Sequence, residues 1–207
     1  MGHREDLLAG AKRCLYEKGY TRTTARDIVA ASGTNLASIG YHYGSKEALL
    51  NLALFEALGE WSEPVDAAVR AAGPDGDPAA RFRAFWEQLL GAFDTHKHLW
   101  AATFEIFTQL DRMPELRKMI AEGTEEARRE WATLFQGIDA AADPATAHAV
   151  GSVYHALLAG VLAQWLTDPE HAPSAAQLVA GLRAIGAGFA KAAAQAAPRG
   201  GAGAAGG

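Results

Sequence analysis

The most informative segment of this chain spans residues 24–45 and reads TARDIVAASGTNLASIGYHYGS. Thr24, followed three positions later by Asp27, forms a capping-box pattern in which both side chains satisfy backbone amides at the start of a helix. The helix that begins there must end near Gly33, and Asn35 offers the N-cap of another short helix. This spacing predicts a helix-turn-helix, a motif that places its second helix in the DNA major groove.

The charges and side chains of this segment fit a nucleic-acid partner. Residues 20–46 carry three basic side chains, Arg22, Arg26 and Lys46, against a single aspartate. The hydroxyl of Thr24 and the free amides beside it are expected to form a phosphate site at the start of the first helix. The second helix presents short or planar side chains that can approach base edges and phosphates, namely Ala37, Ser38, Tyr41 and His42.

Composition favours an all-helical protein with an uneven charge. Ala and Leu account for 67 of the 207 residues and the β-branched Val and Ile for 13, a ratio that suits helices better than strands. The net charge of −5 excludes a uniformly basic nucleic-acid coat. Residues 1–55, however, carry 7 basic and 5 acidic groups, whereas residues 56–207 carry 12 and 19. The sequence therefore predicts a small positive head on an acidic body.

Helix signals continue through the remainder of the chain. The clearest loop signal is the Gly/Pro/Asp cluster at residues 73–78. Pro114 is expected to open a long helix, and Asp143, followed by a proline at the first helical position, another. Ser174 with Gln177 repeats the capping-box pattern before the last helix.

These signals predict an all-α fold with two domains. Residues 1–50 are expected to form a three-helix DNA-binding domain with its helix-turn-helix at about residues 24–43. Residues 51–195 are expected to form a larger helical bundle. The Ala/Gly-rich residues 196–207 are expected to be a disordered tail.

The location predicted from the sequence is the cytoplasm. Cys14 is the single cysteine, so no intrachain disulfide is possible, and its apolar neighbours predict a buried, inert thiol. The N-terminus lacks the apolar run of a signal peptide, and no stretch of about 18 residues is expected to be apolar enough to span a membrane.

Four sequence blocks match a known family. They are EKGY at residues 17–20, TTARDI at residues 23–28, Gly33, and YHYGSKEALL at residues 41–50. Through these blocks, the segment from residue 8 to residue 50 closely resembles the N-terminal DNA-binding domain of TetR-type transcriptional regulators. The rest of the chain resembles that family in architecture only.

The resemblance implies roles for the matching residues. Thr24 corresponds to the phosphate-contacting cap, Arg26 to a DNA contact from the second helix, and Lys46 to a lysine that binds phosphate. For Lys46 the alternative is a solvated pair with Glu47, which would contribute little. Tyr43 matches a buried aromatic of the family. The recognition-helix positions of the family are occupied here by Ala37, Ser38, Tyr41 and His42.

Two positions depart from the family pattern. Gly40 stands where a tyrosine is usual, which removes a common phosphate contact and costs helix stability of about 1 kcal/mol relative to alanine. Leu36 stands where a polar residue is commoner. Base recognition is therefore expected to differ from that of better-known members.

The resemblance also implies a function: a homodimeric repressor that binds a pseudo-palindromic, double-stranded DNA operator and is released by a small apolar or aromatic effector. The last two helices, from about Asp143 and Ser174, are expected to form the dimer interface. Small residues are expected to allow close approach there, namely Gly151, Ala159, Gly160, Ala163, Gly181, Gly186 and Gly188.

Aromatic residues concentrate in the predicted bundle and suggest a cavity for the effector. The candidate ligand contacts are Trp86, Trp100, Phe104, Phe107, Trp131, Tyr154 and His155. Taken singly, each of the aromatic side chains is better explained by core packing than by contact with a ligand.

No cofactor or metal is expected, because His96 and His98 face different sides of a helix and have no further ligand at suitable spacing. Two other functions remain as alternatives. An enzyme using the aromatic cavity lacks a paired acid and base, a nucleophile or a cofactor loop in the sequence. A helical module that binds protein through the N-terminal helices would show the same helix pattern.

Overall fold

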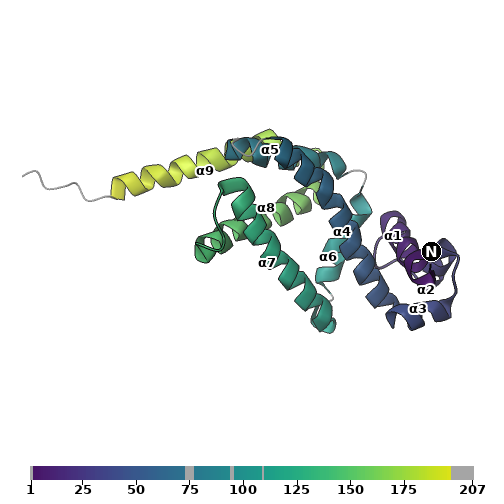
Figure 1. The fold of residues 1–207 in the computed structure, drawn as a ribbon. Coiled ribbons are helices and arrows are strands. Elements are labelled where there is room, and N and C mark those ends of the chain that lie inside the picture. The colour runs from purple at the N-terminus through teal and green to yellow at the C-terminus, as the bar shows by residue number, and fades with distance from the viewer. Residues whose placement is uncertain (1, 73–76, 94–95, 109, 197–207) are drawn as a thin grey trace, which may run out of the picture.

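The computed structural model describes residues 2–72, 77–93, 96–108 and 110–196, whose arrangement is shown in Figure 1. These residues form nine α-helices and one short 3-10 helix, with no strand among them. The predicted all-α fold is confirmed. The elements in chain order are α1 (His3–Lys18), α2 (Ala25–Ser32), α3 (Leu36–Tyr43), α4 (Lys46–Ala71), α5 (Pro78–Ala92), α6 (Lys97–Phe107), η1 (Leu110–Arg112), α7 (Pro114–Gln136), α8 (Pro144–Thr167) and α9 (Ala175–Ala196).

The helix starts predicted in the N-terminal part are confirmed by their caps. The Thr24 hydroxyl accepts a hydrogen bond from the Asp27 amide at 3.2 Å, and Asp27 Oδ2 accepts one from the Thr24 amide at 2.9 Å. Asn35 and Ser45 cap α3 and α4 through their side-chain oxygens. Gly33 ends α2 with a φ of 68°, in the left-handed region that glycine adopts without steric cost. This residue therefore permits the tight turn between α2 and α3.

The first hydrophobic core joins the N-terminal helices to the rest of the molecule. Its buried residues include Leu15 of α1, Ile28 of α2, Ile39 of α3 and Leu50 of α4, and Ile106 of α6 belongs to the same cluster. A three-helix unit of this size cannot close a large core alone, and it shares one with α4 and α6. Figure 1 shows α1–α3 gathered at the end of the molecule opposite α9.

Cys14 lies in this first core with 3% of its surface exposed. Burial is the largest cause that raises the pKa of its thiol. The prediction of a buried thiol is confirmed, and a protonated, enclosed thiol is a poor nucleophile.

A second core, rich in aromatic residues, fills the body between α5, α7 and α8. Phe82 and Phe85 of α5 meet Phe135 of α7 at ring-centroid distances of 5.6 and 5.3 Å, with the rings nearly perpendicular. Phe93 meets Trp165 of α8 at 4.9 Å. Such edge-to-face contacts are the favoured geometry for packed aromatic rings. The aromatic face of α5 therefore lies inside the protein.

The helices α7 and α8 cross at very short range. A Cβ atom placed on Gly151 of α8 would lie only 2.1 Å from the carbonyl oxygen of Arg128 in α7. Glycine is therefore required at this crossing. The sequence predicts Gly151 in the dimer interface, and this prediction is wrong, because Gly151 is buried and its side-chain position faces α7 of the same chain.

The last helix, α9, starts against α5 and then projects away from the body (Figure 1). In its outer part Ile185 is 56% and Phe189 74% exposed. The helix continues to Ala196, so the first residue of the predicted tail is helical. Residues 197–207 of that tail, and residues 73–76 of the predicted loop, lie outside the described residues.

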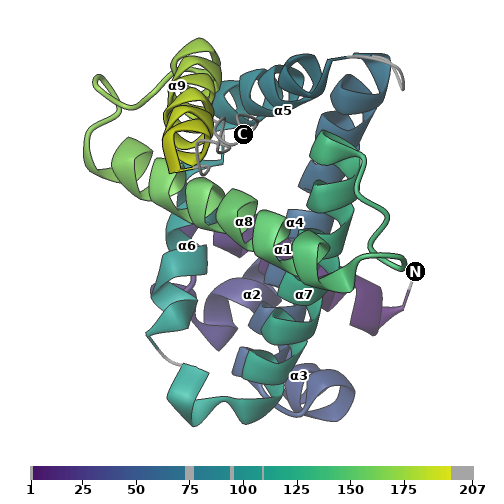
Figure 2. The ribbon, with the colours of Figure 1, turned by 90° about the vertical axis from the view of Figure 1, so that its left-hand side faces the viewer.

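One described helix is long and apolar enough to cross a membrane by length and composition. It is α8, and 28% of its apolar 18-residue stretch is buried inside the protein. The expectation that no segment meets this criterion is therefore wrong. A helix that packs in a soluble protein passes the same test, and α8 runs across the body beside α7 (Figure 2).

Candidate DNA-binding surface

The recognition helix predicted from the sequence is α3, and its rotation is set by two residues that face the core. Ile39 is 5% exposed, and Tyr43, one turn later, packs half-buried against the same cluster. The opposite side of α3 is open to solvent. Its exposed residues are Leu36, Ala37, Gly40 and Tyr41. The last three follow Leu36 by one, four and five positions, a spacing that places all four on one face of an α-helix.

Two of the four predicted recognition-helix contacts lie on this exposed face. Tyr41 is 85% exposed and Ala37 is exposed. Ser38 and His42 are half-buried and flank the face: the Ser38 hydroxyl donates to Asn35 Oδ1 at 3.2 Å, and the His42 ring lies edge-on against Tyr41 at 4.8 Å. The predicted contact set omits Leu36, although this side chain is 52% exposed.

A hydrogen-bonded cluster holds the start of α2. Beside the capping box, the Thr24 hydroxyl donates to Asp27 Oδ2 at 2.6 Å, and Lys18 Nζ lies 2.5 Å from Asp27 Oδ1. The hydrogen bond from Lys18, followed by those from Thr24, holds the pKa of the Asp27 carboxyl far below its usual range. Thr24 is thus exposed and already bonded inside the chain. Arg26 on the same turn is exposed and makes no hydrogen bond or ion pair with the described residues.

Lys46 lies at the start of α4 and has two contacts within the chain. Its Nζ donates to the Thr23 carbonyl oxygen at 3.3 Å and lies 3.3 Å from Glu47 Oε1. The pair with Glu47, which the sequence analysis names as the alternative to a phosphate contact, is therefore present. The Lys46 side chain is 28% exposed, so part of it still reaches solvent.

The side chain of Tyr43 fastens the end of α3 to the start of α1. Its hydroxyl donates to the Arg4 carbonyl oxygen at 2.6 Å, and the Arg4 guanidinium lies 5.7 Å from the ring centroid. The ring is half-buried, close to the core position predicted for it. Together with the buried Ile39, this contact fixes which face of α3 points outward.

Two family models match the chain. The model of "Bacterial regulatory proteins, tetR family" matches residues 7–53, and the model of "Tetracyclin repressor-like, C-terminal domain" matches residues 77–188, more than half of the chain. The protein belongs to the TetR family. The resemblance found in the sequence is confirmed, and the TetR family consists of transcriptional regulators rather than enzymes.

Similar TetR-family and related proteins cover this chain to different extents. The HTH-type transcriptional repressor AcnR of Corynebacterium efficiens is 41% identical over 46 residues, which are 22% of this chain and 24% of that repressor. The chain thus matches about a quarter of the length of this curated relative. A transcriptional regulator from Rhodococcus sp. is 18% identical, with a TM-score of 0.64, over 86% of this chain and 94% of the other. The multidrug binding protein EbrR, complexed with imidazole, is 24% identical, with a TM-score of 0.62, over 86% and 88% of the two chains.

Part of the predicted effector site lies in packed core. Trp86 is 1% and Trp100 4% exposed. The indole Nε1 of Trp86 is buried and has no hydrogen-bond acceptor within the described part of the chain. Phe104 and Phe107 of α6 contact each other at 6.3 Å, and Phe107 is exposed.

The remaining predicted ligand residues lie where α7 meets α8. Trp131 stacks on His155, with centroids 6.0 Å apart and ring planes 25° apart. Burial, followed by the charge of Arg128, lowers the pKa of His155 below its ordinary value. Tyr154 packs against Phe135 at 4.8 Å, and its hydroxyl accepts a hydrogen bond from Gln136.

Two of the predicted ligand residues line grooves on the body of this TetR-family protein, and each lines a different groove. Trp131 lines one of about 670 Å³ between α4 and α7, together with Arg70 and Arg129. Tyr154 lines another of about 280 Å³ beside the start of α5. The other five predicted residues line neither of these grooves. The structure therefore brings the seven together within one body but not around one of these grooves.

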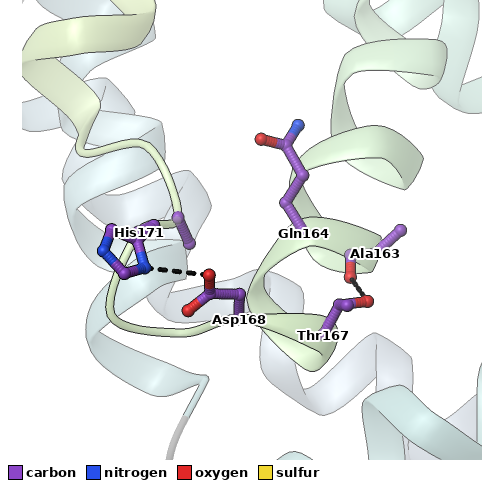
Figure 3. A pocket seen from close by; sticks show the side chains of 6 residues that line it. Ala163, Gln164, Thr167, Asp168 and His171 are labelled. Carbon is purple, nitrogen blue, oxygen red and sulfur yellow. Dashed lines mark hydrogen bonds and ion pairs between the residues drawn. The ribbon is translucent and has the colours of Figure 1, made fainter.

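A third groove, of about 390 Å³, lies at the end of α8 and contains none of the predicted residues (Figure 3). His171 Nδ1 lies 2.8 Å from Asp168 Oδ2 on one side, and Gln164 extends from α8 on the other. This pair does not complete a metal site, because the described residues hold no group of three or more potential ligands.

Proposed function

We propose that this protein is a dimeric, ligand-responsive repressor that binds a pseudo-palindromic DNA operator in the cytoplasm. The observation that carries the proposal is the solvent-exposed face of α3, which is free of contacts to the core. Family membership makes the protein a transcriptional regulator, and the curated relative matched over the N-terminal helices is a repressor.

Residues 1–50 act as the DNA-binding domain. Ala37 and Tyr41 contact base edges in the major groove, with Ser38 and His42 at the margins of the same face. Arg26 contacts a phosphate, since its guanidinium is exposed and makes no hydrogen bond or ion pair with the described residues. Thr24 and Lys46 contact phosphates after exchanging part of their present hydrogen bonds, because a phosphate competes for the same donors.

Residues 51–195 form the effector-binding and dimerisation body. The outer part of α9 supports a second copy as its partner, since Ile185 and Phe189 expose apolar surface that water solvates poorly. Gly160 of α8 and Gly181, Gly186 and Gly188 of α9 have open space where a side chain would lie, which leaves room for close helix packing. Two DNA-binding domains in one dimer would meet half-sites about 34 Å apart.

A small apolar or aromatic effector releases the DNA. The aromatic residues of α5–α8 supply surface for such a molecule, and EbrR, of the same fold, is a multidrug binding protein. The spacing of the two DNA-binding domains must match the spacing of the half-sites. An effector that prefers a conformation of the protein with a different spacing lowers the affinity for DNA by linkage.

Gel retardation with DNA from the promoter region of the protein's own gene tests the proposal. At low salt the protein is expected to retard this DNA, and the double variant R26A/Y41A is expected to lose retardation while keeping its helicity and dimerisation. The matched control is K118A, which also removes one exposed cation, but from the body. Unchanged retardation by R26A/Y41A refutes the assigned surface, and absence of any retardation by the unaltered protein refutes DNA binding at this site.

A further inference from the structure

The exposed face of α3 has an unusual chemistry for a surface that reads DNA. Its four residues, Leu36, Ala37, Gly40 and Tyr41, include no charged side chain and no carboxamide. Guanine is commonly read by arginine or lysine and adenine by asparagine or glutamine, through paired hydrogen bonds in the major groove. None of these side chains is available on this face.

The apolar feature of the major groove is the C5-methyl group of thymine, which Ala and other apolar side chains contact. We propose that Leu36, with Ala37 beside it, recognises thymine methyl groups in each half-site of the operator. This inference rests on the proposed function, in which α3 enters the major groove, and names the base chemistry that α3 reads.

Leu36 is suited to this contact by its position. It is the first residue of α3, it is 52% exposed, and it is absent from both hydrophobic core clusters. Its side chain therefore contributes little to packing in the free protein. Burial of its free surface against a thymine methyl would remove apolar area from water on both partners.

Gly40 lies one turn after Leu36 on the same face and brings the backbone of α3 close to the groove. A Cβ atom at this position would meet nothing within 4 Å in the free protein. Glycine is therefore not required by the fold here, and a helix interior is a costly place for it. Close approach of α3 to base pairs explains why glycine is present at a position where the free protein has room for a side chain. It also places the short side chain of Ala37 within reach of a methyl group.

The charged residues near α3 supply affinity without reading the sequence. Arg26 on α2 is exposed and has no hydrogen bond or ion pair to any described residue. Phosphate contacts from such a side chain fix position but do not distinguish bases. Removal of a methyl group from DNA leaves every phosphate contact intact. The two contributions are therefore separable by experiment.

The test begins with duplexes selected by the protein from a random 30-base-pair library at low salt. Each thymine of the selected duplex is then replaced by uracil, which removes only the methyl group. At the thymine that Leu36 contacts, we expect the dissociation constant to rise about four-fold for one half-site and about fifteen-fold when both half-sites are changed.

A double-mutant cycle assigns that effect to Leu36. L36A should bind the thymine and uracil duplexes equally, whereas L36M, which keeps the apolar surface, should retain the preference for thymine. R26A should weaken binding to both duplexes by the same factor. The L36M variant keeps the test valid if L36A folds poorly.

The proposal is overturned if the selected duplexes lack a common thymine, or if no uracil replacement weakens binding of the unaltered protein. It is also overturned if L36A retains the full preference for thymine. If a selected duplex binds but shows no methyl effect, only the recognition of thymine by Leu36 is refuted, and the proposed DNA binding stands. If no duplex is retained at low salt, both the methyl reading and the proposed DNA binding fail.

Discussion

The backbone amide of Thr21 donates a hydrogen bond of 2.9 Å to Oε2 of Glu105. Thr21 lies in the turn between α1 and α2, whereas Glu105 lies in α6, 84 positions later in the chain. A second contact joins α1 to the start of α6, where the ring centroids of Tyr16 and His96 lie 5.5 Å apart. The N-terminal domain is therefore attached to the body through α6 as well as through the continuous helix α4, and a shift of α6 would be felt at the start of α2.

The substitution Glu105→Ala should loosen this attachment. We expect the Thr21 amide to exchange with solvent faster, and the free energy of unfolding to fall by about 1 kcal/mol, because the amide loses a charged acceptor. Hydrogen exchange measured by NMR checks the first effect and urea unfolding the second. Glu105→Gln, which keeps a side-chain oxygen, should protect the amide nearly as well as the unaltered protein. Equal exchange of Thr21 in all three proteins would contradict the contact.

The substitution Gly40→Ala separates stability from DNA affinity. The open space around Gly40 predicts that the free protein tolerates the methyl group and gains up to about 1 kcal/mol from the better helix former. DNA affinity should nevertheless fall at least ten-fold, because the added group stands between α3 and the bases. Thermal unfolding and gel retardation measure the two effects. A variant that is more stable and binds DNA as well as before would show that α3 does not approach DNA through this face.

The carboxyl group of Asp27 should make stability depend on pH. Its pKa in the folded protein lies below the ordinary value of 3.8, so the unfolded chain binds the proton more readily. The stabilisation is fully present above pH 4 and is lost as the pH falls from about 4 through the folded-state pKa. Asp27→Asn should therefore lower the urea midpoint at pH 7 and change it less at pH 3.

The matched control for Asp27 is Glu126→Gln, which removes an exposed carboxylate from α7. This control should leave the urea midpoint at pH 7 nearly unaltered, because the Glu126 side chain is exposed. A deficit of Asp27→Asn that is as large at pH 3 as at pH 7 would show that the ion pair with Lys18 is not its cause.

The crossing of α7 and α8 predicts a severe effect at one glycine and none at another. Gly151→Ala places a methyl group where the Arg128 carbonyl oxygen lies, and the required shift of α8 should cost about 3 kcal/mol. Gly91→Ala in α5 has open space and should be neutral or slightly stabilising. Chemical unfolding of the two variants provides the comparison. Equal stability of both would contradict the close crossing.

The sequence predicts the N-terminal helices well because their boundaries depend on local interactions. Thr24, Asn35 and Ser45 each cap the helix that follows through a bond to the backbone amide three positions later. The rotation of α3 is less local. Ser38 and His42 flank the exposed face rather than lying on it, because Ile39 and Tyr43 are the residues that the core accepts. The spacing of Leu36, Ala37, Gly40 and Tyr41 is the signal that identifies the face.

The arrangement of the body depends on contacts that the sequence does not reveal. The apolar periodicity of α5 predicts that Phe82 and Trp86 share a face, but it does not say whether rings from α7 fill the space opposite or leave a cavity. The same holds for Gly151, whose small size suits any close helix contact. Only the three-dimensional path of the chain identifies α7, rather than a second copy, as its neighbour.

Photocrosslinking from position 41 tests the central claim most directly. A photoreactive phenylalanine analogue replaces Tyr41 in the protein, and the same analogue replaces Phe189 in a control. With duplex DNA selected by the protein, position 41 should crosslink to DNA bases, whereas position 189 should crosslink to a second copy of the chain. A position-41 adduct with protein and none with DNA, under conditions in which the unaltered protein retards that duplex, would contradict recognition of DNA through the exposed face of α3.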